Sequence, residues 1–378
     1  MQTLFKNSFN TLNLQRYPIT KNQLLQAWDA SDAYLLEHMS NEQAALAKGK
    51  ILIFNDAFGA LTLALHAYKP TILTDSYICQ QSIISNCQDN ALDVENINII
   101  NSLSPLKKNY DYVFIKVPKT LDFLRYFLAN LKPHIHENTQ IVVAIMIKTT
   151  AKTVWNILAQ MLGETSTSLA KKKARLIFVK PAEHSHDKEF SGFPTSFVPD
   201  NSTHRIFNHA NVFSKNKLDI GSRFLLQHLP KLENIKHIID LGCGNGIIGL
   251  NLAVLYPHAQ ILFTDESHMA IASARLTIKH NLPANSNCKF LVTDCLTGVD
   301  HDSADLIVCN PPFHQSHAIG IHIALRMFQQ SHTCLKKGGT FVVVANRHLP
   351  YYSKLKQLFK SIKTIASNNK FSIYCITK

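Results

Sequence analysis

The tetrapeptide Asn310-Pro311-Pro312-Phe313 has the residue types to handle an amine. Its prolines fix φ and cannot donate hydrogen bonds, so the carbonyl of Pro311 projects as an acceptor. With the side-chain oxygen of Asn310, it offers two rigid acceptors to one planar amine, and Phe313 offers a stacking face for a base. The lone pair of an exocyclic amine is delocalised into its ring, and two acceptors would bend the amine towards tetrahedral geometry and make it nucleophilic. The motif predicts methyl transfer to such an amine by positioning and electrostatic stabilisation, without a metal.

A glycine-rich loop upstream predicts a nucleoside cofactor. The run Asp240-Leu241-Gly242-Cys243-Gly244-Asn245-Gly246 follows an apolar segment and opens a helical pattern, and its glycines let the backbone approach a ligand closely. Such loops also occur in dinucleotide sites. A carboxylate ahead of the loop, however, would repel a pyrophosphate and can hold an ammonium group. This favours S-adenosyl-L-methionine, which carries an ammonium and a sulfonium and has no phosphate.

Two further aspartates follow the next strands. We expect Asp265 to accept the ribose hydroxyls, Asp294 to accept the adenine amino group, and the amide of Cys295 to meet a ring nitrogen. Each aspartate alone is more simply a helix cap or turn residue. Three of them at successive strand ends favour the cofactor site. The residues predicted to bind the cofactor are Asp240, Gly242, Gly244, Asn245, Gly246, Asp265, Asp294 and Cys295.

The elements that position these residues alternate along the second half of the chain. Short apolar runs separated by helical patterns occur at Ile238–Leu241, Gln260–Thr264, Lys289–Val292, Leu306–Cys309 and Phe341–Val344. Strands spaced in this way form βαβ units, so we expect an α/β fold with a parallel, doubly wound sheet.

The first half repeats the same plan. Its runs Ile51–Phe54, Thr71–Thr74, Tyr110–Pro118 and Ile141–Ala144 agree with the second half in order, spacing and residue class. We therefore predict a tandem duplication of two Rossmann-like S-adenosylmethionine methyltransferase domains, the N-terminal one degenerate. The predicted division is a degenerate domain over residues 1–180, a linker with a possible hairpin over 181–207, and a catalytic domain over 208–378.

The first half lacks the chemical equipment of the second. Asn55 and Ala57 stand where the second half has loop glycines, and Lys116-Val117 stands in place of Asn310-Pro311. We expect this half to bind no cofactor and to form no acceptor pair. Lys116, Lys119 and the cluster Lys171–Lys173 suggest that it grips the substrate, and a purely structural scaffold is the alternative.

These features together resemble the bacterial ribosomal RNA guanine-N2 methyltransferases, over about Leu12 to Lys378. Besides the two motifs, the resemblance rests on Asn55–Leu61, Lys116–Thr120, Asn208–Ser214, Leu218–Gly221, Val344–Leu349 and Asn368–Phe371. It implies methyl transfer from S-adenosylmethionine to N2 of one guanine in 23S ribosomal RNA. It also implies that Phe213, Asp219 and Gly221 lie near the cofactor pocket.

Three alternatives remain open at this stage. The small-subunit relatives, which act on 16S ribosomal RNA, share the tetrapeptide, and the same acceptor pair suits the N6 amine of adenine or a protein glutamine amide. A catalytically silent RNA-binding protein is the third. The intact Asn310-Pro311-Pro312 and Asp240–Gly246 argue against it.

Charge and composition restrict the partners. Lys and Arg number 39 against 26 Asp and Glu, and this balance favours a polyanion such as RNA. No carboxylate follows Asp305, whereas basic residues continue to Lys378. The eight cysteines show no C-x-x-C pair, so we expect no metal and a reducing compartment. No apolar stretch approaches the ~20 residues of a membrane span. We expect a cytoplasmic protein that needs neither a membrane nor an obligate protein partner.

Overall fold

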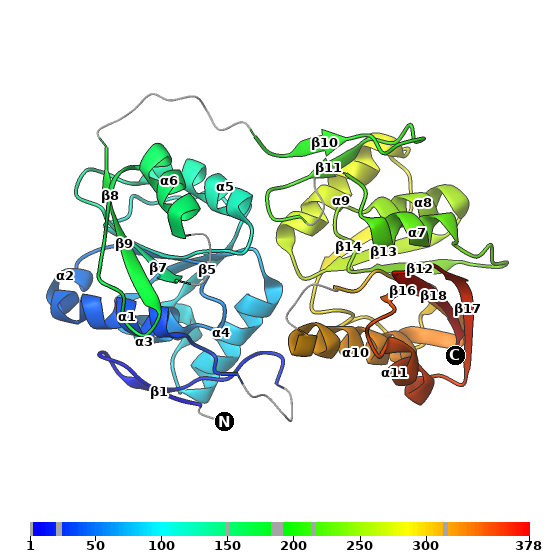
Figure 1. Cartoon of the computed structure of the whole chain (residues 1–378), viewed down its shortest axis with the longest axis horizontal. Helices are drawn as coiled ribbons and strands as arrows, with labels where there is room; N and C mark the ends of the chain where they lie inside the picture. Colours follow the sequence, from blue (N-terminus) through cyan, green and yellow to red (C-terminus); the bar gives the residue numbers. More distant parts are fainter. Residues whose placement is uncertain (1–2, 20–24, 148–150, 183–191, 213–216, 313–316) are drawn as a thin grey trace. The chain divides into compact units, whose positions relative to one another are not determined.

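The computed structural model describes residues 3–19, 25–147, 151–182, 192–212, 217–312 and 317–378. The chain divides into two compact units, Met1–Phe193 and Pro194–Lys378, whose folds are described separately (Figure 1). Within the described ranges, no helix combines the length and the apolar character needed to cross a bilayer.

The second unit is built on a seven-stranded sheet in the order β14-β13-β12-β15-β16-β18-β17. Its strands are β12 (His237–Leu241), β13 (Gln260–Asp265), β14 (Cys288–Val292), β15 (Ala304–Cys309), β16 (Leu335–Asn346), β17 (Ser361–Ser367) and β18 (Phe371–Thr377). The five predicted strands pair in parallel, as the βαβ pattern indicated. The sheet is not wholly parallel, because β18 runs antiparallel between β16 and β17.

Helices cover both faces of this sheet. The helices are α7 (Ile220–Gln227), α8 (Ile247–Leu255), α9 (His268–Asn281), α10 (His317–Cys334) and α11 (Tyr351–Leu358). Buried side chains of α7, α8 and α9 share one apolar cluster with the sheet, and those of α10 and α11 share another. Close packing of α8 on β13 requires Gly249, since a Cβ there would lie 2.0 Å from the ring of Phe263.

A short hairpin precedes this sheet. Strands β10 (Thr195–Phe197) and β11 (Ile206–Asn208) pair antiparallel, in the segment for which the sequence predicted a possible hairpin. β11 packs against α9.

The first unit has a seven-stranded sheet in the order β5-β4-β3-β6-β7-β9-β8. Its strands are β3 (Ile51–Phe54), β4 (Thr71–Thr74), β5 (Asn98–Asn101), β6 (Tyr112–Lys116), β7 (Gln140–Met146), β8 (Gly163–Thr167) and β9 (Ala174–Pro181). Numbered within each unit, both sheets have the order 3-2-1-4-5-7-6, and in both strand 7 runs antiparallel to its two neighbours, strands 5 and 6. This shared topology confirms the predicted duplication of a Rossmann-like fold.

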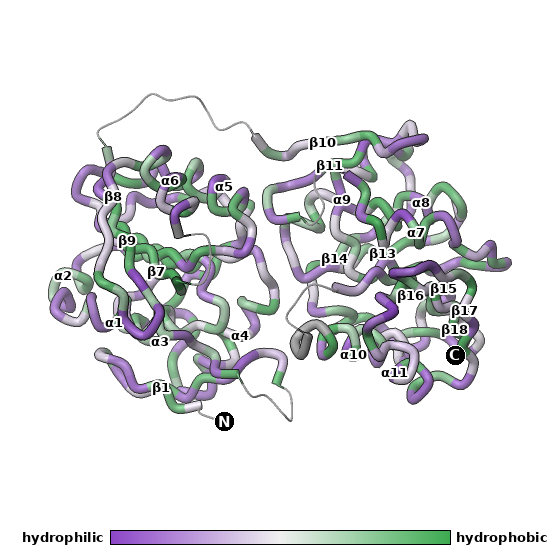
Figure 2. Tube along the Cα trace, viewed as in Figure 1, coloured by the Kyte–Doolittle hydropathy of each residue, from purple (hydrophilic) through white to green (hydrophobic). Residues whose placement is uncertain are grey.

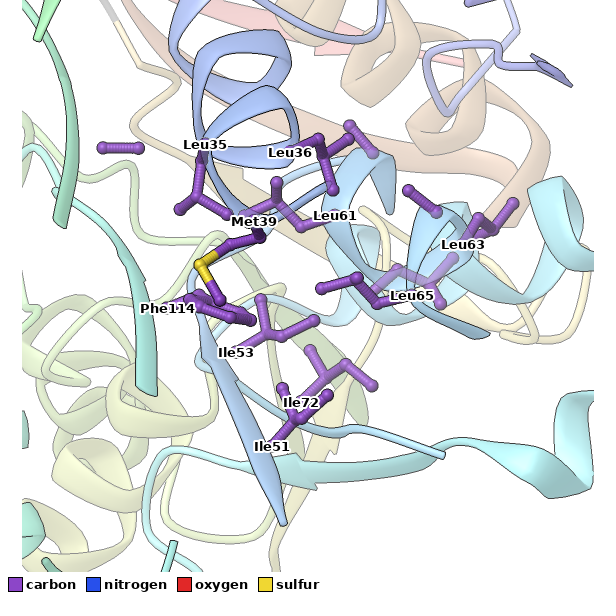
Figure 3. Close-up of a cluster of buried hydrophobic side chains, with 14 of the residues drawn as sticks. Leu35, Leu36, Met39, Ile51, Ile53, Leu61, Leu63, Leu65, Ile72 and Phe114 are labelled. Atoms are coloured by element: carbon purple, nitrogen blue, oxygen red, sulfur yellow. The ribbon is translucent and has the colours of Figure 1, made fainter. Parts of the chain in front are cut away.

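The remaining elements of the first unit surround this sheet. Besides four short 3-10 helices among the described residues, they are the strands β1 (Leu4–Lys6) and β2 (Thr11–Asn13) and the helices α1 (Ala30–Met39), α2 (Gln43–Leu46), α3 (Ala60–Ala64), α4 (Tyr77–Asp89), α5 (Leu121–Leu131) and α6 (Ala151–Met161). Figure 2 shows strand β7 as one of the apolar stretches of this unit. Figure 3 shows part of the core, in which α1 and α3 bring leucines against Ile53, Ile72 and Phe114 of the sheet.

Candidate active site

Asn310 directly follows β15 and is held by the start of α7. Its Nδ2 donates to Oδ2 of Asp219 at 3.2 Å and to Oγ of Ser222 at 2.8 Å. A carboxylate can only accept, so the amide must turn its NH2 group towards Asp219. The Oδ1 of Asn310 is buried and has no hydrogen-bond partner in the part of the chain that the structure describes. The carboxamide is therefore fixed by its NH2 group and keeps a buried acceptor that no described residue uses.

The start of α7 is built to present these groups. Asp219 is its N-cap, and Oδ2 of Asp219 accepts from the backbone amide of Ser222 at 3.0 Å. Gly221 leaves room for this contact, because a Cβ there would lie 3.0 Å from Asp219 Oδ2 and 3.4 Å from Asn310 Oδ1. Ser222 was missed in the sequence, because a serine in the first turn of a helix is not by itself a recognisable signal of a site.

The glycine loop after β12 adopts the conformation that its residue types demand. Gly242, Gly244 and Gly246 have φ values of 71°, 53° and 79°, in the left-handed region that glycine adopts without strain. The amide of Gly244 donates to Oδ2 of Asp265 at 2.9 Å. A Cβ at Gly244 would meet nothing within 4 Å, so the backbone there borders open space. The loop and the Asp265 carboxylate thus lie together at the end of β13, and their contact with a ribose stays a prediction.

Asp240 is buried at the foot of this loop rather than exposed beside it. Its Oδ2 accepts from the amide of Gly249 at 2.8 Å, so the side chain caps the first turn of α8. Burial raises the pKa of this carboxyl to about 7. Its Oδ1 has no partner among the described residues. Contact of Asp240 with a cofactor ammonium stays a prediction.

Asn245 belongs to the scaffold of the loop. Its Nδ2 donates to Oδ1 of Asn208 at 2.9 Å, which ties the loop to β11. Both side chains are buried. The contact explains why an amide stands between two glycines.

Asp294 and Cys295 lie beyond β14, as predicted from the strand ends. Asp294 is buried, and its Oδ2 lies 2.7 Å from a guanidinium nitrogen of Arg326 on α10. Burial, followed by the charge of Asp294, raises the pKa of the Cys295 thiol well above its ordinary value. The Arg326 pair competes with the adenine amine proposed for Asp294, so adenine recognition there stays a prediction.

The rest of the predicted site is only partly described. Pro311 is buried and Pro312 half-buried, whereas Phe213 and Phe313 lie outside the described residues. Over the described ranges, no cluster of three His, Cys, Asp or Glu side chains is arranged to hold a metal ion.

The equivalent position in the first unit is occupied by Lys116. Its Nζ lies 2.9 Å from Asp29, 2.7 Å from Asp32 and 2.6 Å from the hydroxyl of Ser31, all at the start of α1. Only 14% of the Lys116 side chain is exposed. The suggestion that Lys116 grips the substrate is therefore wrong, because its ammonium is an internal ion-pair partner.

The electrostatics of this cluster follow from burial. Burial alone would lower the pKa of Lys116, but Asp32 and Asp29 outweigh it and raise that pKa above its ordinary value. Burial raises the pKa of Asp32 to about 6. The first unit thus places a donor where the second unit places an acceptor.

Sequence comparisons with known proteins agree with a methyltransferase. The family model described as "RLMG N-terminal domain" matches residues 2–183, and that described as "Methyltransferase small domain" matches residues 203–375. A protein named ribosomal RNA large subunit methyltransferase G from Klebsiella pneumoniae subsp. pneumoniae is 44% identical, over 97% of this chain and 96% of its own length. Proteins of the same name from Aeromonas hydrophila and Pseudoalteromonas translucida are 43% and 41% identical, over 99% and 97% of this chain and 98% and 96% of their own lengths.

A solved structure shares the fold over the whole chain. It is described as the 16S rRNA N2 G1207 methyltransferase of T. thermophilus in complex with AdoMet and guanosine. It covers 100% of this chain and 97% of its own at a TM-score of 0.76, with 18% sequence identity. At this identity the solved structure supports the fold alone, whereas the full-length relatives identify the family. The chain belongs to the family of ribosomal RNA large subunit methyltransferase G, and it is an S-adenosylmethionine-dependent ribosomal RNA methyltransferase.

Proposed function

We propose that this enzyme transfers the methyl group to the exocyclic N2 amine of one guanine in 23S ribosomal RNA. The observation that carries the proposal is the buried, unpartnered Oδ1 of Asn310, whose NH2 group is already bound by Asp219 and Ser222. An acceptor fixed in this way suits a hydrogen-bond donor, and together with the carbonyl of Pro311 it suits an amine, which has two hydrogens to donate.

In this mechanism the chain binds, orients and stabilises. Asn310 Oδ1 and the carbonyl of Pro311 accept the two amine hydrogens, and Phe313 stacks on the base. As the amine nitrogen forms a bond to the methyl carbon it gains positive charge, which the two acceptors stabilise. When bound, S-adenosylmethionine would supply the activated methyl group, with its sulfur as the leaving group, so that one bond to the methyl carbon would form and one would break. The surplus proton leaves the amine for water.

The proposed cofactor site is the cradle of the glycine loop and the strand ends. Gly244 and Asp265 would meet the ribose, and Asp294 and Cys295 the adenine. A guanine inside a helix hides its N2, so the target must lie in a loop or be flipped out of its stack. We place the reaction in the cytoplasm, where ribosomal RNA would meet the enzyme.

The subunit is the part of the proposal with a specific rival. The names of the relatives refer to the large subunit, which supports 23S RNA, whereas the full-length structural neighbour is described as a 16S enzyme. Incubation with labelled S-adenosylmethionine and purified 23S or 16S RNA, each free and within its subunit, separates the two. We expect N2-methylguanosine after digestion of 23S RNA. Product in 16S RNA alone would reassign the subunit, and N6-methyladenosine would overturn the target atom.

The acceptor role itself is tested by Asn310→Ala. We expect turnover to disappear while the dissociation constant for S-adenosylmethionine stays nearly unchanged, because Asn310 contacts the amine and not the cofactor. Full activity in this variant would overturn the mechanism.

A further inference from the structure

Charge is unevenly distributed along the edge of the second sheet that carries Asn310. On one side of Asn310, the strand ends and the loop of β12, β13 and β14 carry Asp240, Asp265 and Asp294. On the other side are β16, β18 and β17, which belong to a part of the sequence without any carboxylate, since none follows Asp305. An acidic half suits a cationic cofactor, and a half with only positive charge suits a polyanion.

Strand register identifies the basic residues that lie on the same edge as Asn310. Cys309 pairs with Val343 of β16, so Asn310 stands level with Val344. β16 continues to Asn346, which pairs with Phe371, and Arg347 and Lys370 follow directly at this edge. Three residues of strand separate the level of Asn310 from Arg347, or about 10 Å.

Local hydrogen bonds fix the backbone at this edge and one of its side chains. The backbone amide of Arg347 donates to the carbonyl of Lys370 at 3.0 Å, and its guanidinium donates to the carbonyl of Asn368 at 3.1 Å. Oδ1 of Asn368 in turn accepts from the amides of Lys370 and Phe371, both at 2.8 Å. The turn therefore presents the two residues beside each other, with the Arg347 guanidinium already held and the Lys370 ammonium 5.3 Å from the ring centroid of Phe371.

His348 completes the group. Its amide donates to Oδ1 of Asn346 at 3.1 Å, and its side chain is exposed, as are those of Arg347 and Lys370. A guanidinium has five N–H donors in a fork that matches phosphate oxygens, and the bond to Asn368 uses only one nitrogen.

We infer that Arg347, His348 and Lys370 form a phosphate-binding rim that holds the RNA backbone beside the target nucleotide. A nucleotide placed at Asn310 has its neighbours within reach of this rim. The inference rests on the proposed acceptor role of Asn310, because that residue defines where the target base lies.

The chain offers a matched pair of charge-removing variants. Arg347→Gln with Lys370→Gln removes two charges from the rim. Lys337→Gln with Lys360→Gln removes two exposed charges from the opposite edge of the sheet. Lys337 lies near the start of β16 and Lys360 directly precedes β17, and these two strands run in the same direction, because both are antiparallel to β18. Both variants are made in the full chain, and melting temperature and S-adenosylmethionine binding check that each is folded.

The experiment measures the dissociation constant for purified 23S and 16S ribosomal RNA between 50 and 200 mM salt. For the rim variant we expect about tenfold weaker binding at the higher salt, and a salt slope smaller by about 1.4 for two lost single-strand phosphate contacts. For the opposite-edge variant we expect binding within about twofold of the unmodified protein.

Equal effects of the two variants, or none from either, would overturn the rim. The binding test does not depend on which nucleoside is methylated. A product other than N2-methylguanosine would refute the proposed target atom, but the phosphate-binding rim would still be tested by the two dissociation constants.

Discussion

Replacing Ser222 with alanine tests whether the orientation of Asn310 controls the reaction. Ser222 is 8% exposed, and its hydroxyl accepts from Asn310 Nδ2 at 2.8 Å, the shorter of the two bonds that fix the amide. Its loss leaves one N–H without a partner in a buried site, at a cost of about 1–3 kcal/mol. If the amide then turns to recover a bond, Oδ1 leaves the amine. The same energy in the activation barrier lowers kcat by about 5- to 150-fold.

The assay separates this effect from general damage. Steady-state kinetics should show a loss in kcat with the KM for S-adenosylmethionine close to that of the unmodified enzyme, and Ser222→Thr should restore part of kcat by returning a hydroxyl. Ser331→Ala is the control, because it removes a hydroxyl from a fully buried residue of α10 that has no partner among the described residues. Unchanged kcat in Ser222→Ala, or an equal loss in Ser331→Ala, would refute the reasoning.

Three further substitutions have expected outcomes. Gly221→Ala should change the melting temperature little, because the helix preference of alanine, about 1 kcal/mol, is offset by the disturbed Asp219 cap. It should slow methyl transfer at least about tenfold, because the new Cβ pushes against the carboxylate that holds the catalytic amide. Asp240→Asn tests the buried carboxyl, whose pKa of about 7 lies above its unfolded value near ~4. Between these two pKa values the folded state holds a proton that the unfolded state has lost. The free energy of unfolding of the unmodified protein should therefore fall as pH rises from 4 to 7, by at most about 4 kcal/mol. Asparagine does not titrate, so in urea denaturation the variant should become more stable relative to the unmodified protein as pH rises over this range. Lys116→Met leaves Asp29 and Asp32 without their cation and should destabilise the first unit by about 3–5 kcal/mol in thermal unfolding.

Sequence patterns predicted the buried parallel strands of both sheets and the edge strand β14, but they missed the antiparallel strands β9 and β18, although both are largely buried. Ile51–Phe54 is buried at every position, and such runs between glycine-rich loops and helical patterns are readily recognised. β5 (Asn98–Asn101) and β17 (Ser361–Ser367) lie at the sheet edges and have largely polar or exposed residues. Their pairing depends on neighbouring strands rather than on their own hydrophobicity, so no local pattern indicated them.

The sequence predicted which residue types form the site, but not which of these residues contact one another. Asn310 and Ser222 are separated by 88 positions, and only the fold brings the amide to the start of α7. Asp240 has the residue type of a ligand contact, but the closeness of α8 makes it a buried cap. Lys116 has the residue type of a surface charge, and the two carboxylates that bury it lie in an N-terminal segment that showed no motif.

The two units show what separates a working acceptor site from a closed one. In each, an aspartate N-cap contacts the residue at the end of the fourth strand: Asp29 contacts Lys116, the last residue of β6, and Asp219 contacts Asn310, directly after β15. The third residue of that helix is neutral Ser222 in the second unit, so an amide satisfies the cap and keeps its oxygen for the ligand. In the first unit it is Asp32, and two carboxylates side by side require a cation. Lys116→Asn alone would therefore leave a buried negative charge unpaired instead of restoring an acceptor. At least the residues at positions 32 and 116 must change together, and this coupling explains how loss of the site in one copy became an interior ion pair.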